Sequence, residues 1–571
     1  ASDVYKRQAW DGKHGLYSDA DNNSQTRVED MLEGVILALT NQSAIGDAWD
    51  ELFRTFNQRK GKGTVGYQKG EKIAIKINLN DNGGSNIIDA TPQSVCSLLY
   101  QLVEVVGVPQ NCITVYDAQR RGISAVYTYV ESLYPDVVYQ NWGGFVPNVI
   151  HYSSEITDEG AMSLARAAYE ADYMINMALL KRHSEPTKRW RDSAGQTGIT
   201  ATGKNQFGSV GKVPPLHYSI RDWSSFRGMG TYNCIVDLMA HERIGGNTLV
   251  YIVDGMYVNP KHNGKAFRFK RAPFNNGWTS SFFASNDQVA IESVVLDFIY
   301  SELPLPANSD NFLHEAANIG NPPSGILYKG RDQQSLGVHE HWNNPDDRLY
   351  SRNLGTGEGI ELYRVPLKAN RAAIETFYAD RSVVVGKGEV VLYWNTSNGQ
   401  KVLLNGKEVA GKGNLIVAVK RTSSFELLVE DADGKVVKQR LVVRNMDEVK
   451  DCPVRDAKLE GTFLINDQGQ LALSGERSKE RNVATWNIQV PKKGKYYLGA
   501  TYTGTDPAPA FVYLNGEKVT ENFGFLVTVG NQPRDYYFPI ELEKGTSTLQ
   551  FEIQGRRGNR IHRLFIVKER N

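Results

Sequence analysis

The sequence predicts a multidomain protein, in which an α/β domain with a mostly parallel sheet is followed by two all-β sandwich domains. The chain of 571 residues is long enough for about three or four domains. Apolar strand patterns alternate with helical patterns up to about residue 300. From residue 382 onward, short alternating strands are separated by Asn-Gly, Gly-Lys and Asp-Gly turns, which are typical of hairpins.

The α/β domain begins as strand, loop, helix and strand. The apolar alternation of residues 72–79 (KIAIKINL) predicts a strand, and Thr91-Pro92 begins a helix that continues to about Val108. Residues 113–117 (ITVYD) form the next strand. Because a helix joins the two strands, we expect them to pair in parallel with a right-handed crossover.

Further segments extend this domain on both sides. Periodicity of 3.6 residues predicts helices over 28–40, 48–57, 161–170, 233–241 and 287–300, the last capped by Ser285 or Asn286. Short apolar runs predict buried strands over 136–139, 173–180 and 249–254.

We expect the α/β domain to span residues 21–370 and an immunoglobulin-like sandwich of about seven strands to span 380–445. A linker over 445–456 leads to a second all-β unit over 457–570. Residues 1–20 are expected to be non-native or disordered, since ASDVYKRQ resembles the read-through of a sequencing adapter. A native export signal would then be missing, and we expect a periplasmic, cell-surface or secreted location.

Charge and cysteine content exclude several classes of function. Lys and Arg total 65 against 64 Asp and Glu, so no nucleic-acid partner is expected. No run of 18 apolar residues predicts a transmembrane segment. None of the four cysteines forms CxxC, so no iron–sulfur cluster is expected. Cys96 and Cys112 are either buried free thiols or a pair.

The polar loop after strand 173–180 is the strongest candidate for catalysis. Lys181 and His183 follow the strand at once, and Lys204 follows later in the loop. Two ammonium groups and an imidazole can act as acid and base around a developing oxyanion. Asp254, at the end of the strand LVYIVD, is the fourth catalytic candidate. Solvated charges and loop hydrogen bonds are the structural alternative.

Amide, hydroxyl and carboxyl groups near strand ends are candidates for substrate binding, because ligands of parallel sheets bind at the carboxyl ends of the strands. These residues could orient substrate hydroxyls or a cation, while Asx turns are the alternative for Asn and Asp. The candidates are Asn78, Asn80, Asp117, Thr202 and Asn205.

The segment GVHEHWNN is the candidate for a divalent metal. If it is a strand, His339 and His341 share one face and form a metal pair. The third ligand would come from elsewhere, the candidates being His183, His217, His241, Asp254 and Asp117. Acid/base or sugar-binding use of the histidines, with a sugar stacked on Trp342, is an equal alternative.

Three separated pieces of the first 370 residues resemble the bacterial family called domain of unknown function 362. They are KIAIKINL with Thr91-Pro92, then VYIVDG with the later FFASNDQVAIESV, and between them a motif made of Ala171, Asp172, Ile175, Asn176, Lys181, His183, Thr200, Lys204, Asn205, Phe207 and Gly208. The resemblance implies an α/β domain and an enzyme of unsettled reaction. Some members of the family carry a cysteine cluster, which this chain lacks.

The C-terminal unit resembles a galactose-binding-like jelly roll of the carbohydrate-binding-module type. The matching positions are Trp486, Pro491, Gly494, Tyr496, Asn515-Gly516 and Gly545. Thr546-Ser547 and His562-Arg563 stand where the family often has Asn and Asp. The resemblance implies either a glycan-binding module or a spacer.

Three hypotheses of function follow. The first is an exported bacterial enzyme that uses acid/base chemistry on a polyhydroxylated carbohydrate or derived metabolite, neutral or anionic. The second is a non-catalytic surface protein that binds glycans. The third is a metal-dependent hydrolase or oxidoreductase built on His339 and His341.

Overall fold

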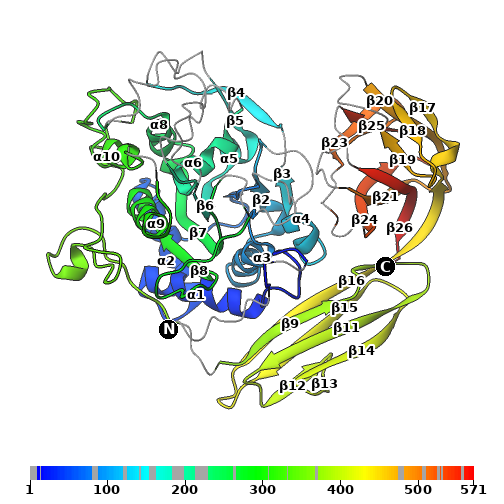
Figure 1. Ribbon diagram of the computed structural model, residues 1–571, viewed down its shortest axis with the longest axis horizontal. Helices are drawn as coiled ribbons and strands as arrows, with labels where there is room; N and C mark the ends of the chain where they lie inside the picture. The colour runs from blue at the N-terminus through cyan, green and yellow to red at the C-terminus, as the bar shows by residue number, and fades with distance from the viewer. Residues whose placement is uncertain are drawn as a thin grey trace.

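The computed structural model describes residues 10–12, 15–79, 88–119, 125–140, 143–153, 162–182, 198–211, 229–261, 265–305, 308–330, 332–366, 371–473, 481–504, 510–523, 528, 532–554 and 559–570. The chain forms an α/β unit and two β-sandwiches (Figure 1). The predicted fold class is confirmed.

A six-stranded sheet organises the α/β unit. Its strand order is β3-β2-β1-β6-β7-β8, and every neighbouring pair is parallel except β7 and β8. The strands are β1 (Ile73–Lys76), β2 (Ile113–Tyr116), β3 (Val138–Gln140), β6 (Tyr173–Lys181), β7 (Thr248–Asn259) and β8 (Ser281–Ser285).

Helices cover both faces of this sheet, because its strands are apolar on both sides. Along β1, Ile73 and Ile75 face one hydrophobic cluster and Ala74 faces the other. The first cluster includes side chains of α1 (Gln25–Thr40), α2 (Ile45–Arg59) and α3 (Pro92–Tyr100). The second includes α8 (Cys234–Ala240), α9 (Gln288–Glu302) and α10 (Asn311–Ala317).

Smaller elements complete the unit. A π-helical turn, Gln101–Val105, extends α3. The other α-helices and strands described in this unit are α4 (Ala125–Val130), β4 (Phe145–Ile150), β5 (Met162–Ala165), α5 (Arg166–Glu170) and α6 (Thr202–Asn205). The strands β4 and β5 form a separate antiparallel pair.

Several local predictions are wrong. The helix expected over 161–170 is half strand, since β5 pairs with β4 before α5 begins. The N-cap of α9 is Asp287, whose carboxylate accepts the backbone N–H groups of Val289 and Ala290.

The N-terminal boundary at residue 21 is also wrong. Trp10 is 2% exposed, and its ring stacks on Trp278 with centroids 5.3 Å apart. Tyr17 and Tyr257 pack edge-on in the same group of rings. The α/β unit therefore includes the described residues from Trp10 onward, and residues 1–9 lie outside the described ranges.

The first sandwich packs two sheets over one core. One sheet has the order β14-β11-β9, and the other joins β12, β13, β15, β10 and β16. Their bounds are β9 (Ala373–Ala379), β10 (Val383–Val385), β11 (Gly388–Ser397), β12 (Lys401–Leu404), β13 (Lys407–Glu408), β14 (Lys412–Val419), β15 (Ser423–Glu430) and β16 (Val436–Cys452).

The linker expected over 445–456 is wrong, because β16 continues through it. This strand pairs with β15 in the first sandwich and then with β26 (Arg560–Glu569) in the second. Figure 1 shows it running from one sandwich into the other. The two sandwiches therefore share a strand.

The second sandwich also has two sheets. One has the order β17-β20-β25-β22-β23, and the other contains β18, β19, β26, β21 and β24. The Asn-Gly turn works as expected, since Asn515 and Gly516 both have positive φ between β22 and β23. The bounds are β17 (Lys458–Glu460), β18 (Phe463–Ile465), β19 (Leu471–Leu473), β20 (Arg481–Val490), β21 (Gly494–Thr503), β22 (Ala510–Leu514), β23 (Glu517–Phe523), β24 (Arg534–Leu542) and β25 (Gly545–Gln554).

Cys96 and Cys112 are free thiols, so the alternative of a pair is wrong. Cys96 is buried as expected, whereas Cys112 is partly exposed. Among the described residues, no helix has the length and apolar character needed to cross a bilayer.

Candidate functional site

A buried polar cluster lies where β1 and β2 end. Lys76 is the last residue of β1, and Asp117 directly follows β2. The Lys76 Nζ atom lies 3.5 Å from Asp117 Oδ2 and donates to Asn205 Oδ1 at 3.0 Å. Because neighbouring parallel strands end at the same edge, residues distant in sequence meet here.

Asparagine side chains extend this cluster toward β6. Asn205 Nδ2 donates to Asn176 Oδ1 at 2.9 Å, and Asn176 Nδ2 donates to the carbonyl of Thr202 at 2.8 Å. Asn78 Nδ2 reaches Asn205 Oδ1 at 3.4 Å. The short helix α6 is thereby fixed against the ends of β1 and β6.

One carboxylate oxygen of Asp117 has no hydrogen-bond partner among the described residues. Its Oδ2 accepts the backbone N–H of Leu79 at 2.9 Å, whereas Oδ1 is buried without a partner among the described residues. The backbone of Gly208 lies directly against this pair, since an added Cβ would come within 2.3 Å of Asp117 Oδ1 and 2.6 Å of Lys76 Nζ. Close packing on the ion pair thus explains the glycine of the family motif.

Glu292 of α9 holds the other side of α6. Its Oε1 accepts the Thr202 hydroxyl at 2.6 Å and the Gly203 N–H at 2.7 Å. Burial raises the pKa of Glu292 to about 7, and these hydrogen bonds oppose the rise.

The structure brings together only part of the predicted site. Asn78, Asp117, Thr202 and Asn205 meet in the polar cluster, as the contacts above show. Lys204 stands on the same short helix, is 6% exposed, and has its Nζ 5.6 Å from the ring centroid of Phe207.

Two other candidates, Lys181 and Asp254, lie elsewhere. Lys181 is fully buried but lies five residues beyond Asn176, roughly 16 Å further along β6. Asp254 is not at a strand end, since β7 continues to Asn259. Its carboxylate accepts the N–H groups of Thr91 and Met256, and burial raises its pKa. Asn80 and His183 lie outside the described residues.

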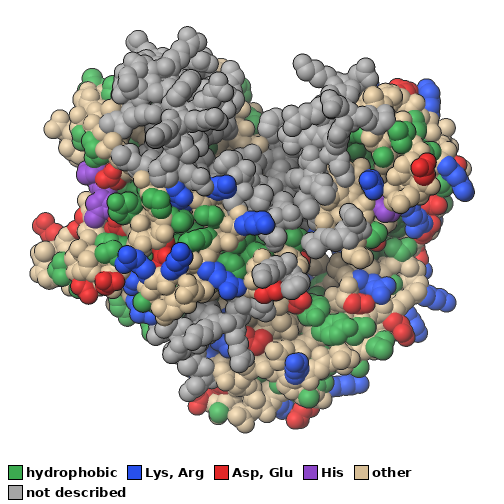
Figure 2. All heavy atoms as spheres, viewed as in Figure 1, with side chains coloured by type: hydrophobic (Ala, Val, Ile, Leu, Met, Phe, Trp, Pro, Cys, Tyr) green, Lys and Arg blue, Asp and Glu red, His purple; other side chains and the backbone are tan. Residues whose placement is uncertain are grey.

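A second polar group gathers three histidines around Asp310, beside α10. The expected strand over His339 and His341 is absent, because the described backbone there is irregular. The two rings nevertheless lie 5.0 Å apart, and His314 lies 4.4 Å from His339. Among the described residues, the third group within reach is Asp310, and not the expected His241, Asp254 or Asp117. The other two expected ligands, His183 and His217, lie outside the described residues. Figure 2 shows purple histidine side chains beside acidic ones at the left edge.

The titration of this group follows from its contacts. Hydrogen bonds with Asp297 and Asp310 raise the pKa of His341 to about 10. Burial, and then the neighbouring histidines, lower the pKa of His339 to about 3. Hydrogen bonds from His314 and His341 hold the pKa of Asp310 well below its usual range.

Trp342 is half-buried and packs against other side chains. Its ring packs edge-on against Phe298 at 5.0 Å, and its backbone N–H donates to Asp297 at 3.0 Å. The stacking of a sugar on this ring stays a prediction.

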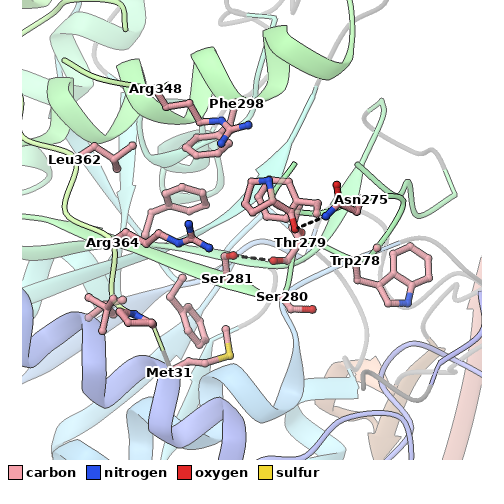
Figure 3. A pocket seen from close by; sticks show the side chains of 18 of the residues that line it. Met31, Asn275, Trp278, Thr279, Ser280, Ser281, Phe298, Arg348, Leu362 and Arg364 are labelled. Carbon is pink, nitrogen blue, oxygen red and sulfur yellow. Dashed lines mark hydrogen bonds between the residues drawn. The ribbon is translucent and has the colours of Figure 1, made fainter. Parts of the chain in front are cut away.

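A separate cavity of about 700 Å³ opens beside β8 and α1. Figure 3 shows Arg348 and Phe298 on one side of it, Arg364 on another, and Met31 of α1 below. Its lining combines aromatic rings with the cations Arg268, Arg348 and Arg364 and the acids Asp30 and Asp347. The polar cluster contributes no residue to this lining.

The backbone around the cavity is unusual. Asn275, Asn276, Ser280 and Arg348 all have positive φ, between 41° and 63°. Such conformations disfavour L-residues, above all at Ser280 and Arg348, and they gather at binding sites.

Sequence reasoning missed three features. The cavity was not anticipated, although the segment FNNGWTSSFF (274–283) combines aromatic and turn residues that could have signalled it. Asp310 and His314 have the spacing of one helical turn, which places two ligand types on one face. Nothing in the sequence indicated that Glu292 belongs to the site, because an acidic residue within a helix is usually exposed to solvent.

A family model supports the resemblance seen in the sequence of the α/β unit. The protein consists of an α/β unit followed by two β-sandwiches. Residues 73–297 match the family model described as "Domain of unknown function (DUF362)". The family resemblance of the α/β unit is therefore confirmed. No curated protein matches the chain.

The C-terminal unit is structurally similar to carbohydrate-binding modules. A family 35 module from Paenibacillus barcinonensis has 16% identity and a TM-score of 0.18, over 20% of this chain and 94% of that chain. One from Clostridium thermocellum has 19% identity and a TM-score of 0.16, over 19% and 87%. A module of Cellvibrio mixtus lichenase 5A, in complex with cellotriose, has 10% identity and a TM-score of 0.18, over 21% and 98%.

Proposed function

We propose that the α/β unit is an enzyme that uses acid/base chemistry on a polyhydroxylated carbohydrate or derived metabolite, favouring an anionic one. The observation that carries this proposal is the unpartnered Oδ1 of Asp117, held beside Lys76 at the carboxyl edge of the parallel sheet. A buried acceptor without a donor is costly in a folded protein, and such groups concentrate where a ligand supplies the donor.

The surrounding residues have separable roles. Lys76 donates to Asn205 and to the carbonyl of Ile77 while it pairs with Asp117, so it is a positioning residue. Asp117 is the base, since its Oδ1 can accept a proton from a substrate hydroxyl or carbon acid. Lys204 is the cation that stabilises a substrate carboxylate or a developing oxyanion. The amides of Asn78 and Asn205 orient hydroxyl groups.

Burial of the cluster favours this chemistry. Lys76 is 0% exposed, Asp117 3% and Asn205 1%. Charges in such surroundings interact more strongly than in water, and their partners need little reorganisation during the reaction.

The test is turnover of a panel of aldonic acids, uronic acids and acidic oligosaccharides, followed by mass spectrometry. We expect Asp117→Asn to lower kcat by roughly 10²–10⁴-fold, because the amide cannot accept the proton. Asp136→Asn, an exposed change in the same unit, serves as the control. Full activity in Asp117→Asn would contradict the proposal.

The cavity beside β8 favours a second candidate function, which is binding of an anionic glycan without catalysis. Three arginines, two acidic residues and several aromatic rings line it. The rings suit a sugar face, and the arginines, which outnumber the acids, suit a carboxylate. Arg364 is exposed, so its replacement leaves the fold intact.

Calorimetric titration with acidic oligosaccharides tests this second function. Arg364→Ala should weaken binding by roughly tenfold, the loss of one charge-assisted hydrogen bond. Arg421→Ala, on the first sandwich, should bind as the unchanged protein does. Equal affinity in Arg364→Ala would remove the cavity as the binding site.

A further inference from the structure

The histidine group beside α10 has the arrangement of a metal site. It is separate from the polar cluster at Asp117 and from the cavity beside β8. Asp310, His339 and His341 each offer one ligand atom, and these atoms all lie within 4.8 Å of one another. His341 Nε2 and Asp310 Oδ2 are 3.5 Å apart. Two ligands of a tetrahedral zinc ion are separated by roughly 3.3–3.5 Å, given bonds of about 2.0–2.1 Å.

The hydrogen bonds of His339 leave its outer nitrogen available as a ligand. The Ser293 hydroxyl has one proton, which it donates to the carbonyl of Val289 at 2.8 Å. Ser293 Oγ must therefore accept from His339 Nδ1, which lies 2.8 Å away. In this tautomer His339 Nε2 carries a lone pair, and that atom is buried without a hydrogen-bond partner among the described residues.

His341 is oriented in the same way. Its Nδ1 lies 2.7 Å from Asp297 Oδ1, so Nε2 is directed toward Asp310. Metal-binding histidines almost always donate their second N–H to a carboxylate, carbonyl or hydroxyl partner. Ser293 and Asp297 supply both partners from one face of α9, four residues apart.

We propose that His339 Nε2, His341 Nε2 and Asp310 bind a divalent zinc-class ion, with a fourth coordination position left for His314 or water. Two imidazoles and a carboxylate match the ligand preference of Zn²⁺ and do not suit Mg²⁺ or Ca²⁺, which prefer oxygen. His314 Nε2 lies 3.3 Å from Asp310 Oδ2. The side chain of His341 is 46% exposed, so an ion can enter from solvent.

The experiment measures zinc stoichiometry by mass spectrometry of the chelator-treated, zinc-reloaded protein, and affinity by calorimetric titration. We expect one equivalent of Zn²⁺, with no competition from Mg²⁺ at millimolar concentration. His341→Ala should lose binding by at least about 100-fold, and this exposed position tolerates the change without unfolding. His151→Ala replaces an exposed histidine outside the group and should bind as before.

Ser293→Ala tests the orientation of His339 while every ligand is kept. Loss of the Nδ1 partner should weaken zinc binding by roughly 10–100-fold. Two results would overturn the proposal: a protein that retains no stoichiometric zinc, or a His341→Ala variant that binds zinc as tightly as the unchanged protein. Neither readout involves turnover, so this site stands or falls independently of Asp117.

Discussion

Single buried side chains set the geometry of the polar cluster, and Glu292 is the clearest case. It contacts no substrate group in our proposal, yet it fixes both Thr202 and Gly203 at the start of α6. Lys204 and Asn205 follow on the same short helix. Glu292 is therefore a positioning residue, and its ionisation makes the stability of the protein depend on pH.

We expect the free energy of unfolding to fall as pH rises from about 4.5 to 7. The folded state keeps a proton on Glu292 up to a pKa of about 7, whereas the unfolded carboxyl has a pKa of 4.5. The folded state binds more protons between these values, so stability declines by about 3 kcal/mol over this window. Urea titrations at pH 4.5 and pH 8 measure the difference.

Glu292→Gln should remove this contribution, since its amide oxygen still accepts both hydrogen bonds and carries no charge. The exposed change Glu408→Gln should leave it in place. The assignment fails if Glu292→Gln shows the same loss of stability with pH as the unchanged protein.

At this scale the sequence could predict that Asn78 and Asp117 lie close together, because polar residues at the ends of adjacent parallel strands converge. Their role in substrate binding stays a prediction. It could not place Asp254 or Lys181. β7 continues past Asp254 to Asn259, and β6 extends beyond the end of β1, whose last residue Lys76 pairs with Asn176. β7 is buried along its whole length, so periodicity gives no sign of where it ends.

The strand β16 is the element that joins the two sandwiches. Met446 stands near its middle, is fully buried, and packs with Tyr497 and Phe565 of the second sandwich. The sequence NMDEVKDCPVRD resembles a linker because it is rich in charged residues. In the structure the register of the strand shifts between Glu448 and Lys450. Only the pairing with β26 identifies it as a strand.

Met446→Ala should destabilise both sandwiches together. Removal of a buried Met side chain costs about 2–5 kcal/mol, and the strand belongs to both sheets. Hydrogen exchange should therefore become faster in β15 and in β26. The exposed Ile416→Ala on β14 should change neither. Faster exchange in one sandwich alone would show that β16 does not couple them.

At the scale of the whole molecule, side-chain contacts join the α/β unit to both sandwiches. Arg444 of β16 pairs with Glu131, just after α4, at 2.8 Å. Tyr127 of α4 packs against the core of the second sandwich. The hydroxyl of Ser24, which caps α1, donates to the carbonyl of Ile374 in the first sandwich. The sandwiches are thus braced against the α/β unit, an arrangement that the order of domains along the sequence cannot reveal.

The central claim is that substrate binds at the carboxyl edge of the parallel sheet, beside Asp117. The most direct test is a crystal structure of the Asp117→Asn variant soaked with an acidic sugar that the unchanged protein converts. We predict a sugar hydroxyl within hydrogen-bond distance of residue 117 and the sugar carboxylate beside Lys204. Ligand density confined to the cavity at Trp278 and Arg364 would contradict the claim.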